Sequence, residues 1–521
     1  MKKSLIYFFV LPIIVSTIVY PQISSRKIDK LVKEAMETFN VAGVAIGIVK
    51  DGKVIHNKGY GVKSIETNQP VDEHTNFAIA SNTKAFTTAA LSILVDNGEL
   101  SWNDKVVDII PEFKMYNDYV TQSFIIKDLV THRSGLGLGA GDLQFWPTGA
   151  DFTMEDILKN FKYFKPVSPL RTKFDYDNIL YVVAGEVIAR VSGRSWEECI
   201  KQKILNPLEM DDTYTYYGEI EDFSNIAAPH LNMNGNLEIV EPFKNDPEKI
   251  NGAAAAIISN VDDLSKWMLV HLNEGRYGEN LEKELFSKKN HREMWKLHTV
   301  YNADTSARYN SHFAGYGLGW ALSDAQGNMI VSHGGYVAGM LSRVLMLPDL
   351  NFGMAILTNT ELSGGRLNRA VINTIIDKYL GLNKKDWVSY YFEKYNKQDA
   401  KGDSVTSNVW ATVDTANQSN INVEDYIGIY EDNWFGKVEI DTLDSQLWFK
   451  SLRSPKLSGP MYYYKANAFA IKWTRRELIA DAFAIFSLDE EGKAQNIKMK
   501  GISPNIDFSY DFHDLDLHRI E

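Results

Sequence analysis

Two residues of one short run have the types and spacing needed for nucleophilic catalysis. Ser81 and Lys84 are three positions apart in Ser81-Asn82-Thr83-Lys84. If a helix starts at Ser81, both side chains lie on one face, one turn apart. A serine hydroxyl is a poor nucleophile near neutral pH, and a partly desolvated lysine can accept its proton. Because this spacing is common by chance, the interpretation depends on partners elsewhere in the chain.

The segments before Ser81 indicate how it is positioned. Residues 24–39 have the pattern of an amphipathic helix, and residues 41–50 have that of a strand. Asp51-Gly52 is a hairpin turn signal that leads into a second strand at 53–56. A helix and a hairpin ahead of a helix predict an antiparallel sheet packed on helices. The fold class is therefore mixed α+β rather than doubly wound.

The segments after Ser81 supply more helices and the rest of the sheet. Residues 125–136 are expected to form a helix that runs into the glycine-rich loop 135–141, and residues 180–190 a buried helix. Asn260 is the expected N-cap of another helix. Four strands are expected to complete the sheet begun near Val44, at 320–323, 329–332, 342–347 and 352–358.

The last quarter of the chain is expected to be a separate unit. Residues 383–422 are rich in Lys, Asn, Asp, Ser and Thr, which indicates a linker that is helical in its first part. Residues 423–521 alternate apolar and polar residues in short segments divided by turns. This pattern predicts an up-and-down barrel or half-barrel. Its interior is expected to be filled by side chains, with a small-ligand cavity as the alternative.

Composition excludes several classes of function. The net charge of −12 leaves no basic surface for nucleic acid. The single cysteine, Cys199, cannot form an intramolecular disulfide and is expected to be packed as a small apolar residue. No zinc-binding spacing occurs among the 11 histidines, so we expect no metal and no cofactor. The glycine-rich loop lacks the context of a phosphate site and is expected to be a mobile surface loop, with His132 making structural hydrogen bonds at its base.

The N-terminus has the features of an export signal. Lys2 and Lys3 precede an apolar run from Leu5 to Tyr20. The run is shorter than the ~20 apolar residues that span a bilayer. We therefore expect residues 1–22 to be a signal peptide of a periplasmic or extracellular protein, with an uncleaved membrane anchor as the alternative.

Three motifs in a fixed order connect the serine with possible partners. Ser81-Asn82-Thr83-Lys84 is followed by Tyr176-Asp177-Asn178 and then by His333-Gly334-Gly335. Together they resemble the serine β-lactamase and penicillin-binding-protein superfamily, and within it the class C-related esterase and D-aminopeptidase branch. The resemblance covers about residues 26–382, and residues 423–521 resemble the lipocalin-like domain that follows some of these enzymes.

The resemblance implies a role for each matching residue. Ser81 would attack the substrate carbonyl and become acylated, and Lys84 would accept its proton. Tyr176 would relay a proton to the leaving group and activate the deacylating water. Asn178 would orient Lys84 and the substrate amide. His333 and Gly335 would form the substrate-binding strand, and the backbone N–H groups of Ser81 and Tyr336 would form the oxyanion hole, worth ~3 kcal/mol per donor.

Two departures from the family pattern limit the expected substrates. His333 and Gly334 stand where many relatives carry Lys and Thr or Ser, so a cation and a hydroxyl for a β-lactam carboxylate are missing. Esters, amides and small peptides, D-amino-acid-containing ones included, are the substrates this favours. Arg171 and Lys173 precede Tyr176 where relatives often have Pro-Gly; they are expected to be solvated, or else to meet an acidic substrate group.

Three functions remain open at this point. The first is an exported serine hydrolase that forms an acyl-enzyme with a small-molecule or peptide substrate. The second is a β-lactamase. The third is a penicillin-recognising protein that is acylated without efficient turnover. Intact motif residues favour turnover, and the oligomeric state is not predicted.

Overall fold

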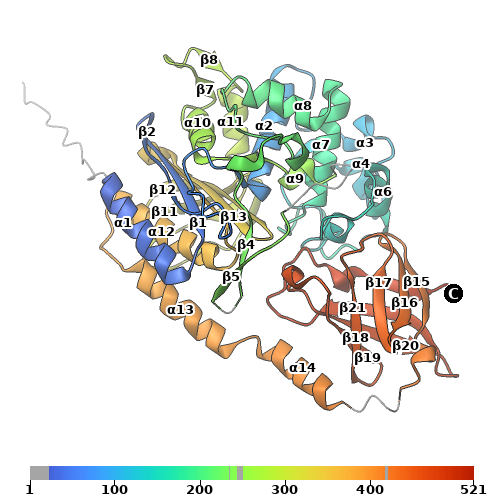
Figure 1. Ribbon diagram of the computed structural model, residues 1–521. Coiled ribbons are helices and arrows are strands. Elements are labelled where there is room, and N and C mark those ends of the chain that lie inside the picture. The colour runs from blue at the N-terminus through green and yellow to red at the C-terminus, as the bar shows by residue number, and fades with distance from the viewer. Residues whose placement is uncertain (1–22, 234, 243–249, 417–420) are drawn as a thin grey trace, which may run out of the picture.

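The computed structural model describes residues 23–233, 235–242, 250–416 and 421–521. The expected signal peptide, residues 1–22, lies outside them. No helix within the described ranges is long and apolar enough to cross a bilayer. The chain forms an α+β unit followed by a β-barrel, and the two are linked by a pair of helices (Figure 1).

The α+β unit is built on one antiparallel sheet of eight strands in the order β2-β1-β14-β13-β12-β11-β10-β9. Strand β1 pairs with β14, so the beginning and the end of the unit are neighbours, with Val44 opposite Thr358. This confirms that the late strands complete the sheet begun near Val44. The strands are Gly43–Lys50 (β1), Lys53–Gly61 (β2), Thr299–Tyr301 (β9), Ala314–Tyr316 (β10), Ala321–Ala325 (β11), Asn328–Val337 (β12), Met340–Leu347 (β13) and Phe352–Thr358 (β14).

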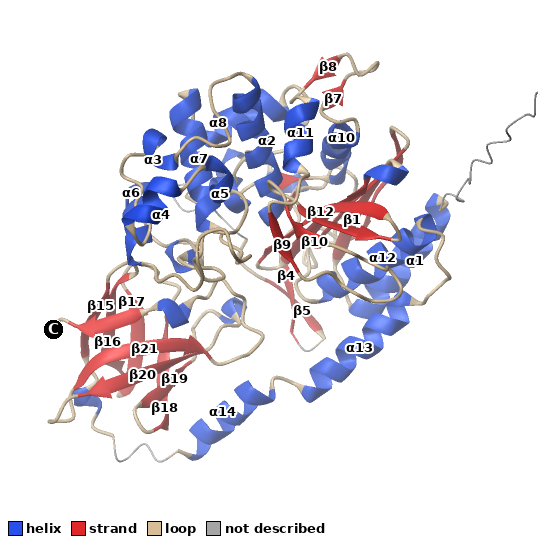
Figure 2. Ribbon diagram, turned by 180° about the vertical axis from the view of Figure 1, so that it is seen from behind, coloured by secondary structure: helices blue, strands red, loops and turns tan. Residues whose placement is uncertain are grey.

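Helices cover both faces of this sheet. One face carries α1 (Ser25–Phe39), α12 (Ser363–Tyr379) and α13 (Trp387–Lys401), which share a hydrophobic core with the strands (Figure 2). The other face carries α10 (Val261–Leu272), whose N-cap is Asn260 as predicted: its side chain accepts the Asp263 N–H at 2.9 Å. Because both faces are covered, β1 and β14 are buried almost throughout and read as continuous apolar runs.

A helical subdomain stands beside the sheet, around two buried helices. These are α2 (Thr83–Asp96) and α7 (Ile179–Ser192), and most side chains of both are buried on every side. Most of their residues are accordingly apolar or small, with Lys84 on α2 as the buried exception. The surrounding helices are Val106–Ile109 (α3), Asp118–Ser123 (α4), Ile126–Leu129 (α5), Met154–Asn160 (α6), Trp196–Ile200 (α8), Gly252–Ala255 (α9) and Lys288–Met294 (α11).

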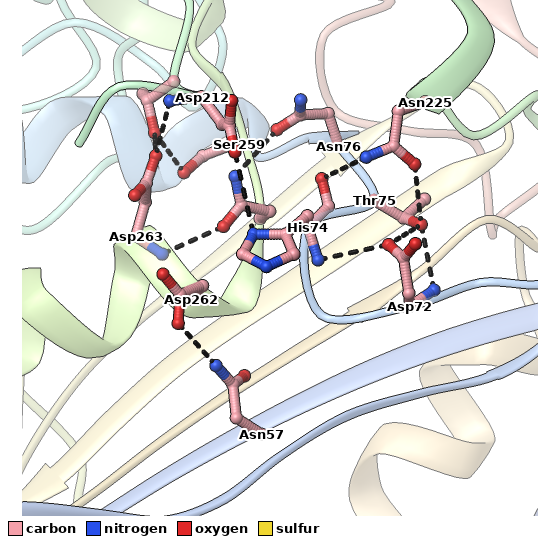
Figure 3. Close-up of polar contacts among 12 residues, drawn as sticks. Asn57, Asp72, His74, Thr75, Asn76, Asp212, Asn225, Ser259, Asp262 and Asp263 are labelled. Atoms are coloured by element: carbon pink, nitrogen blue, oxygen red, sulfur yellow. Dashed lines mark hydrogen bonds and ion pairs between the residues drawn. The ribbon is translucent and has the colours of Figure 1, made fainter.

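A polar cluster holds the chain just before Ser81 (Figure 3). Thr75 Oγ1 donates to Asp72 Oδ1 at 2.7 Å, and Asn260 Nδ2 donates to Asn76 Oδ1 at 3.2 Å. The next residues form the short strand β3 (Phe77–Ala78), which pairs with β6 (Ile258–Ser259). The chain therefore enters the Ser81 turn from a fixed direction. Two further short pairs are His230–Met233 (β4) with Asn236–Ile239 (β5), and Arg276–Tyr277 (β7) with Lys283–Glu284 (β8).

The last hundred residues form a closed barrel of eight antiparallel strands. Its interior is filled by buried aromatic side chains, including Tyr430, Phe449, Phe469 and Phe486. The preceding segment contains α13 and α14 (Ser404–Thr415). The barrel strands are Gly428–Asp432 (β15), Gly436–Leu443 (β16), Gln446–Ser451 (β17), Ser458–Lys465 (β18), Ala468–Ile471 (β19), Ala482–Leu488 (β20), Ala494–Gly501 (β21) and Asp516–Arg519 (β22).

The barrel is docked on the helical subdomain. Arg453 forms ion pairs with Asp151 at 2.7 Å and with Asp156 at 2.8 Å, at the start of α6. Asn160 Nδ2 donates to the Trp434 carbonyl oxygen at 3.0 Å. Apolar side chains of both units also belong to one continuous hydrophobic core. The barrel is thus packed against the first unit through polar and apolar contacts together.

Candidate active site

Ser81 lies in a tight turn that leads directly into α2. The turn is a single 3₁₀ turn, Ala80–Asn82, closed by the Asn82 N–H on the Ile79 carbonyl oxygen at 3.2 Å. Ala80 has φ of 47°, a backbone conformation that residues with a side chain rarely adopt. The residues around Ser81 are buried while Ser81 itself is half-buried. The turn thereby presents the hydroxyl to a cleft.

Lys84 is fully buried and faces Ser81 from the first turn of α2. Its Nζ is 3.0 Å from Ser81 Oγ, 2.7 Å from Asn178 Oδ1 and 3.0 Å from the Ala254 carbonyl oxygen. Burial lowers the pKa of Lys84 to about 7, and the Asp142 carboxyl partly opposes this. A substantial share of Lys84 is therefore a neutral amine near pH 7, the form that can accept a proton.

Tyr176 approaches the same pair from the loop before α7. The Lys84 Nζ lies 5.0 Å from the centroid of its ring. Burial raises the pKa of the Tyr176 hydroxyl, and a hydrogen bond with Ser81 partly opposes this. The rings of His132 and Tyr176 are packed together, with centroids 4.1 Å apart, and His132 Nδ1 accepts the Asp177 N–H at 3.0 Å. The structural role predicted for His132 is thus confirmed.

Strand β12 forms the opposite wall of the site. His333 is 5% exposed. Its pKa is lowered to about 3, mainly because the ring is buried and secondly because of the positive charge of the nearby Lys84. Its Nδ1–H donates to the Gly334 carbonyl oxygen at 2.7 Å and its Nε2 accepts from the Tyr316 hydroxyl at 2.8 Å. His333 is therefore a neutral, fixed side chain and supplies no cation.

Gly335 and Tyr336 follow His333 on the same strand. A Cβ on Gly335 would lie 2.0 Å from the Ile79 carbonyl oxygen, so only glycine lets β12 approach the Ser81 turn this closely. The Tyr336 hydroxyl donates to the buried carboxyl of Glu361. The position of β12 beside the Ser81 turn is thus fixed by the close approach at Gly335 and by the hydrogen bond of Tyr336.

A cation that sequence reasoning missed lies beside Gly334. Arg343 is opposite Gly334 on β13, and a Cβ added to Gly334 would be 3.0 Å from Arg343 Nη1. Arg343 Nη2 donates to Ser332 Oγ at 3.0 Å, and burial lowers its pKa. Among the described residues it forms no ion pair with a carboxylate. His333 and Gly334 themselves supply neither a cation nor a hydroxyl, as expected, and Arg343 is a guanidinium beside them that the prediction did not include. Gly334 leaves room for a guanidinium from the next strand.

The barrel also contributes to the site, through the segment Asp507–Asp511. The ring of Phe508 packs edge-on against Tyr176, and the Ser509 hydroxyl donates to Asp142 Oδ2 at 2.8 Å. Nothing in the alternating barrel pattern predicted this contact. It also corrects the prediction of a mobile glycine-rich surface loop: Leu136 and Ala140 are buried, and Gly139 lies against the Phe508 backbone.

The two basic residues ahead of Tyr176 are not in the site. Arg171 forms a two-pronged ion pair with the buried Asp128, at 2.9 Å and 2.6 Å, and Lys173 pairs with Asp175 at 2.8 Å. Neither is free to meet a substrate. Cys199 is buried as predicted, and burial raises the pKa of its thiol. Within the described ranges, no group of three or more His, Cys, Asp or Glu residues is arranged to hold a metal ion.

All seven candidate site residues except Lys84 border a single cleft of about 1120 Å³, and Lys84 lies buried behind Ser81. The same cleft is lined by Arg343 from the sheet and by Asp507, Phe508 and Ser509 from the barrel. It offers a nucleophile, a buried base, a phenol and a strand edge to one bound molecule. That set is suited to acyl transfer.

The fold and this arrangement define a class: the serine β-lactamases and penicillin-binding proteins. A family model described as Beta-lactamase matches residues 28–374, and a domain of unknown function (DUF3471) matches residues 414–519. The chain belongs to the Beta-lactamase family and, in general terms, is a serine hydrolase.

Named relatives agree with this assignment. Unguisins hydrolase ungD' of Aspergillus campestris is 29% identical over 388 residues, which is 71% of this chain and 69% of that protein. Protein flp of Staphylococcus aureus is 26% identical over 351 residues, 64% of this chain and 63% of its own length. The chain is similar in sequence to both proteins.

Solved structures support the whole architecture. The octameric penicillin-binding protein homologue from Pyrococcus abyssi matches with a TM-score of 0.59 and 21% identity, over 95% of this chain and 100% of that one. EstCE1, a hydrolase with promiscuous acyltransferase activity, matches with a TM-score of 0.56 and 18% identity, over 67% of this chain and 97% of that one. At these identities the likeness concerns the fold alone.

Proposed function

We propose that the protein is an exported serine hydrolase that acts through an acyl-enzyme on amides, small peptides or esters. Ser81 attacks the substrate carbonyl and Lys84 accepts its proton. Tyr176 passes a proton to the leaving group and then activates the deacylating water, while Asn178 orients Lys84 and the substrate amide. The backbone N–H groups of Ser81 and Tyr336 stabilise the oxyanion.

The observation that carries this proposal is the pair formed by Ser81 and Lys84. Their side chains are 3.0 Å apart, and Lys84 is held by two further acceptors with a pKa of about 7. A base with a pKa near the working pH is the most effective for proton transfer. Tyr176 keeps its proton at neutral pH because burial raises its pKa, so the resting phenol can act as a donor.

The wall formed by β12 favours substrates that carry no charge beside the scissile bond, and an anion can be met only by the guanidinium behind Gly334. His333 is neutral and Gly334 carries no hydroxyl, so neither supplies the usual contacts to a carboxylate beside the scissile bond. Arg343 is the nearest cation on this wall, and it lies behind Gly334 rather than on the strand edge. The Aspergillus campestris relative is named as a hydrolase of unguisins, which supports hydrolytic turnover over acylation without turnover.

Two other functions are separated from this one by turnover and substrate. A β-lactamase would hydrolyse nitrocefin faster than esters, and a penicillin-recognising protein would be labelled once without turnover. The test is a panel of p-nitrophenyl esters, D-amino-acid p-nitroanilides and nitrocefin, together with a fluorophosphonate probe. We expect turnover of esters or anilides and labelling that Ser81→Ala abolishes. Equal labelling of Ser81→Ala would refute Ser81 as the nucleophile.

Export rests on the sequence of residues 1–22 and remains a proposal. Expression of the full chain in a Gram-negative host, followed by fractionation, tests it. We expect a mature protein in the periplasm with an N-terminus beyond Tyr20. Recovery of intact protein from the membrane fraction would support the anchored alternative instead.

A further inference from the structure

A chain of hydrogen bonds runs from the barrel to the candidate base. Ser509 Oγ donates to Asp142 Oδ2 at 2.8 Å, and Asn178 Nδ2 donates to the same oxygen at 2.7 Å. Asn178 Oδ1 in turn accepts from Lys84 Nζ at 2.7 Å. Each of these four side chains is at most 8% exposed. The side-chain amide of Asn178 is therefore fixed at both ends, by the amine on one side and by the Asp142 carboxyl on the other.

The barrel also fixes the backbone around Asp142. Asp511 Oδ2 accepts the Gly141 N–H at 2.7 Å, and Asp511 Oδ1 accepts the Leu143 N–H at 3.2 Å. The two accepted N–H groups flank Asp142 in sequence, so one barrel carboxyl clamps both sides of it. Asp142 and Asp511 are both fully buried. Burying two carboxyl groups is costly unless each is hydrogen-bonded, which argues that the contact has a purpose beyond packing.

We propose that Ser509 and Asp511 of the barrel are positioning residues for Lys84, because they hold Asp142, which orients Asn178 against the lysine amine. The inference rests on the proposed function, in which Lys84 is the base. In this arrangement the barrel is part of the active site, and it affects Lys84 through the carboxyl of Asp142.

Asp142 also carries an electrostatic effect on Lys84. Burial raises the pKa of Asp142 to about 7, against the hydrogen bonds from Asn178 and Ser509 that favour its charged form. An ionised Asp142 stabilises the protonated Lys84 and so raises the lysine pKa. The groups that face Asp142 and interact with its charge are Lys84 on α2, Tyr176 and Asp177 before α7, and Asp507 and Asp511 from the barrel.

The test compares pH profiles of ester hydrolysis in full-length variants. Asp142→Asn keeps a carbonyl oxygen for Asn178 and Ser509 but removes the charge. We expect its acidic limb to move to lower pH by about one pH unit, because an anion near the lysine is lost. Ser509→Ala loses the hydrogen bond that favours the ionised form of Asp142. The acidic limb of its pH–rate profile should therefore also move to lower pH, by less than in Asp142→Asn. Asp142→Ala, which leaves Asn178 without its acceptor, should lose at least about tenfold of the plateau rate.

The control is Ser487→Ala, an exposed serine on β20 of the same barrel, whose profile should overlay that of the wild type. The inference would be overturned if the acidic limb of the pH–rate profile stays in place in both Asp142→Asn and Ser509→Ala. It would also be overturned if these two variants lose activity by the same factor at every pH. Failure of the proposed function is distinguishable, because it would appear as ester turnover that Ser81→Ala leaves intact. Ser509→Ala and Asp142→Asn change few atoms, so the test does not depend on folding of Asp142→Ala.

Discussion

The ring of Phe508 lies edge-on to the ring of Tyr176, with centroids 5.6 Å apart. The first residue belongs to the barrel and the second to the site beside Ser81. A Cβ on Gly139 would lie 2.5 Å from the Phe508 carbonyl oxygen, so the backbone of this segment is also fitted to the glycine-rich loop. One wall of the cleft is therefore supplied by a separate unit of the chain, which can affect substrate size independently of the reacting groups.

Phe508→Ala should widen the cleft on the barrel side. Because the ring is half-buried against Tyr176, its removal leaves space rather than a new polar group. We expect kcat/KM for long-chain or aromatic p-nitrophenyl esters to rise about tenfold relative to p-nitrophenyl acetate, the scale of steric discrimination in apolar pockets. The control is Ile485→Ala on the exposed surface of β20. An unchanged ratio between large and small esters would show that Phe508 does not limit size.

How much of this site the sequence could predict depends on the range of the contacts involved. Ser81 and Lys84 are three residues apart, and a 3₁₀ turn that continues into the first turn of α2 brings them together, so their contact is local. Strands β1, β2, β13 and β14 were predictable because their apolar runs and turns are local. Phe508 and Arg343 were missed for a different reason. Arg343 meets Gly334 only through the register of β12 and β13, and Phe508 meets Tyr176 only through the docking of two units, which no local pattern encodes.

The lowered pKa of Lys84 predicts a pH dependence of acylation. Only the neutral amine accepts the Ser81 proton, so the rate should rise with pH and be half-maximal near the lysine pKa of about 7. Initial rates of fluorophosphonate labelling between pH 5 and 9 measure this. Lys84→Arg, which stays protonated, should label about 10² to 10⁴ times more slowly throughout the range. A flat wild-type profile would argue against Lys84 as the base.

Gly334 and Arg343 predict how the protein treats carboxylate-bearing lactams. Gly334→Thr restores a hydroxyl on the strand, and the added Cβ would lie 3.0 Å from the end of a flexible arginine side chain, which can shift. One added hydrogen bond to a charged group is worth about 1.5 kcal/mol, so nitrocefin kcat/KM should rise about tenfold.

Arg343→Ala is the matched change on the opposite strand. It should lower nitrocefin kcat/KM while leaving p-nitrophenyl acetate, which has no carboxylate, within about threefold of the wild type, because a fixed charge acts chiefly on charged partners. If Arg343→Ala weakens both substrates equally, its role is to support β12 and not to bind an anion.

Burial of Lys84 predicts that this residue lowers the free energy of unfolding of the wild type more at low pH than at high pH. In the folded protein the pKa of Lys84 is about 7, and its ordinary value is 10.5. Below pH 7 the amine is charged in both states and the folded state bears the full desolvation cost. As pH rises from 7 to 10.5, only the folded state loses the proton, so this cost disappears.

Lys84→Met should therefore raise the free energy of unfolding at pH 6, by about 1 to 3 kcal/mol, and by much less at pH 10. Urea denaturation at both pH values measures the difference, with activity expected to be lost in the same variant. The control is Lys53→Met, an exposed position on β2, where surface substitutions change stability by less than ~0.5 kcal/mol. A gain that is equal at pH 6 and pH 10 would mean that packing of the methionine, and not removal of a buried charge, is responsible. A loss at pH 6 would mean that the three hydrogen bonds of Lys84 outweigh its desolvation.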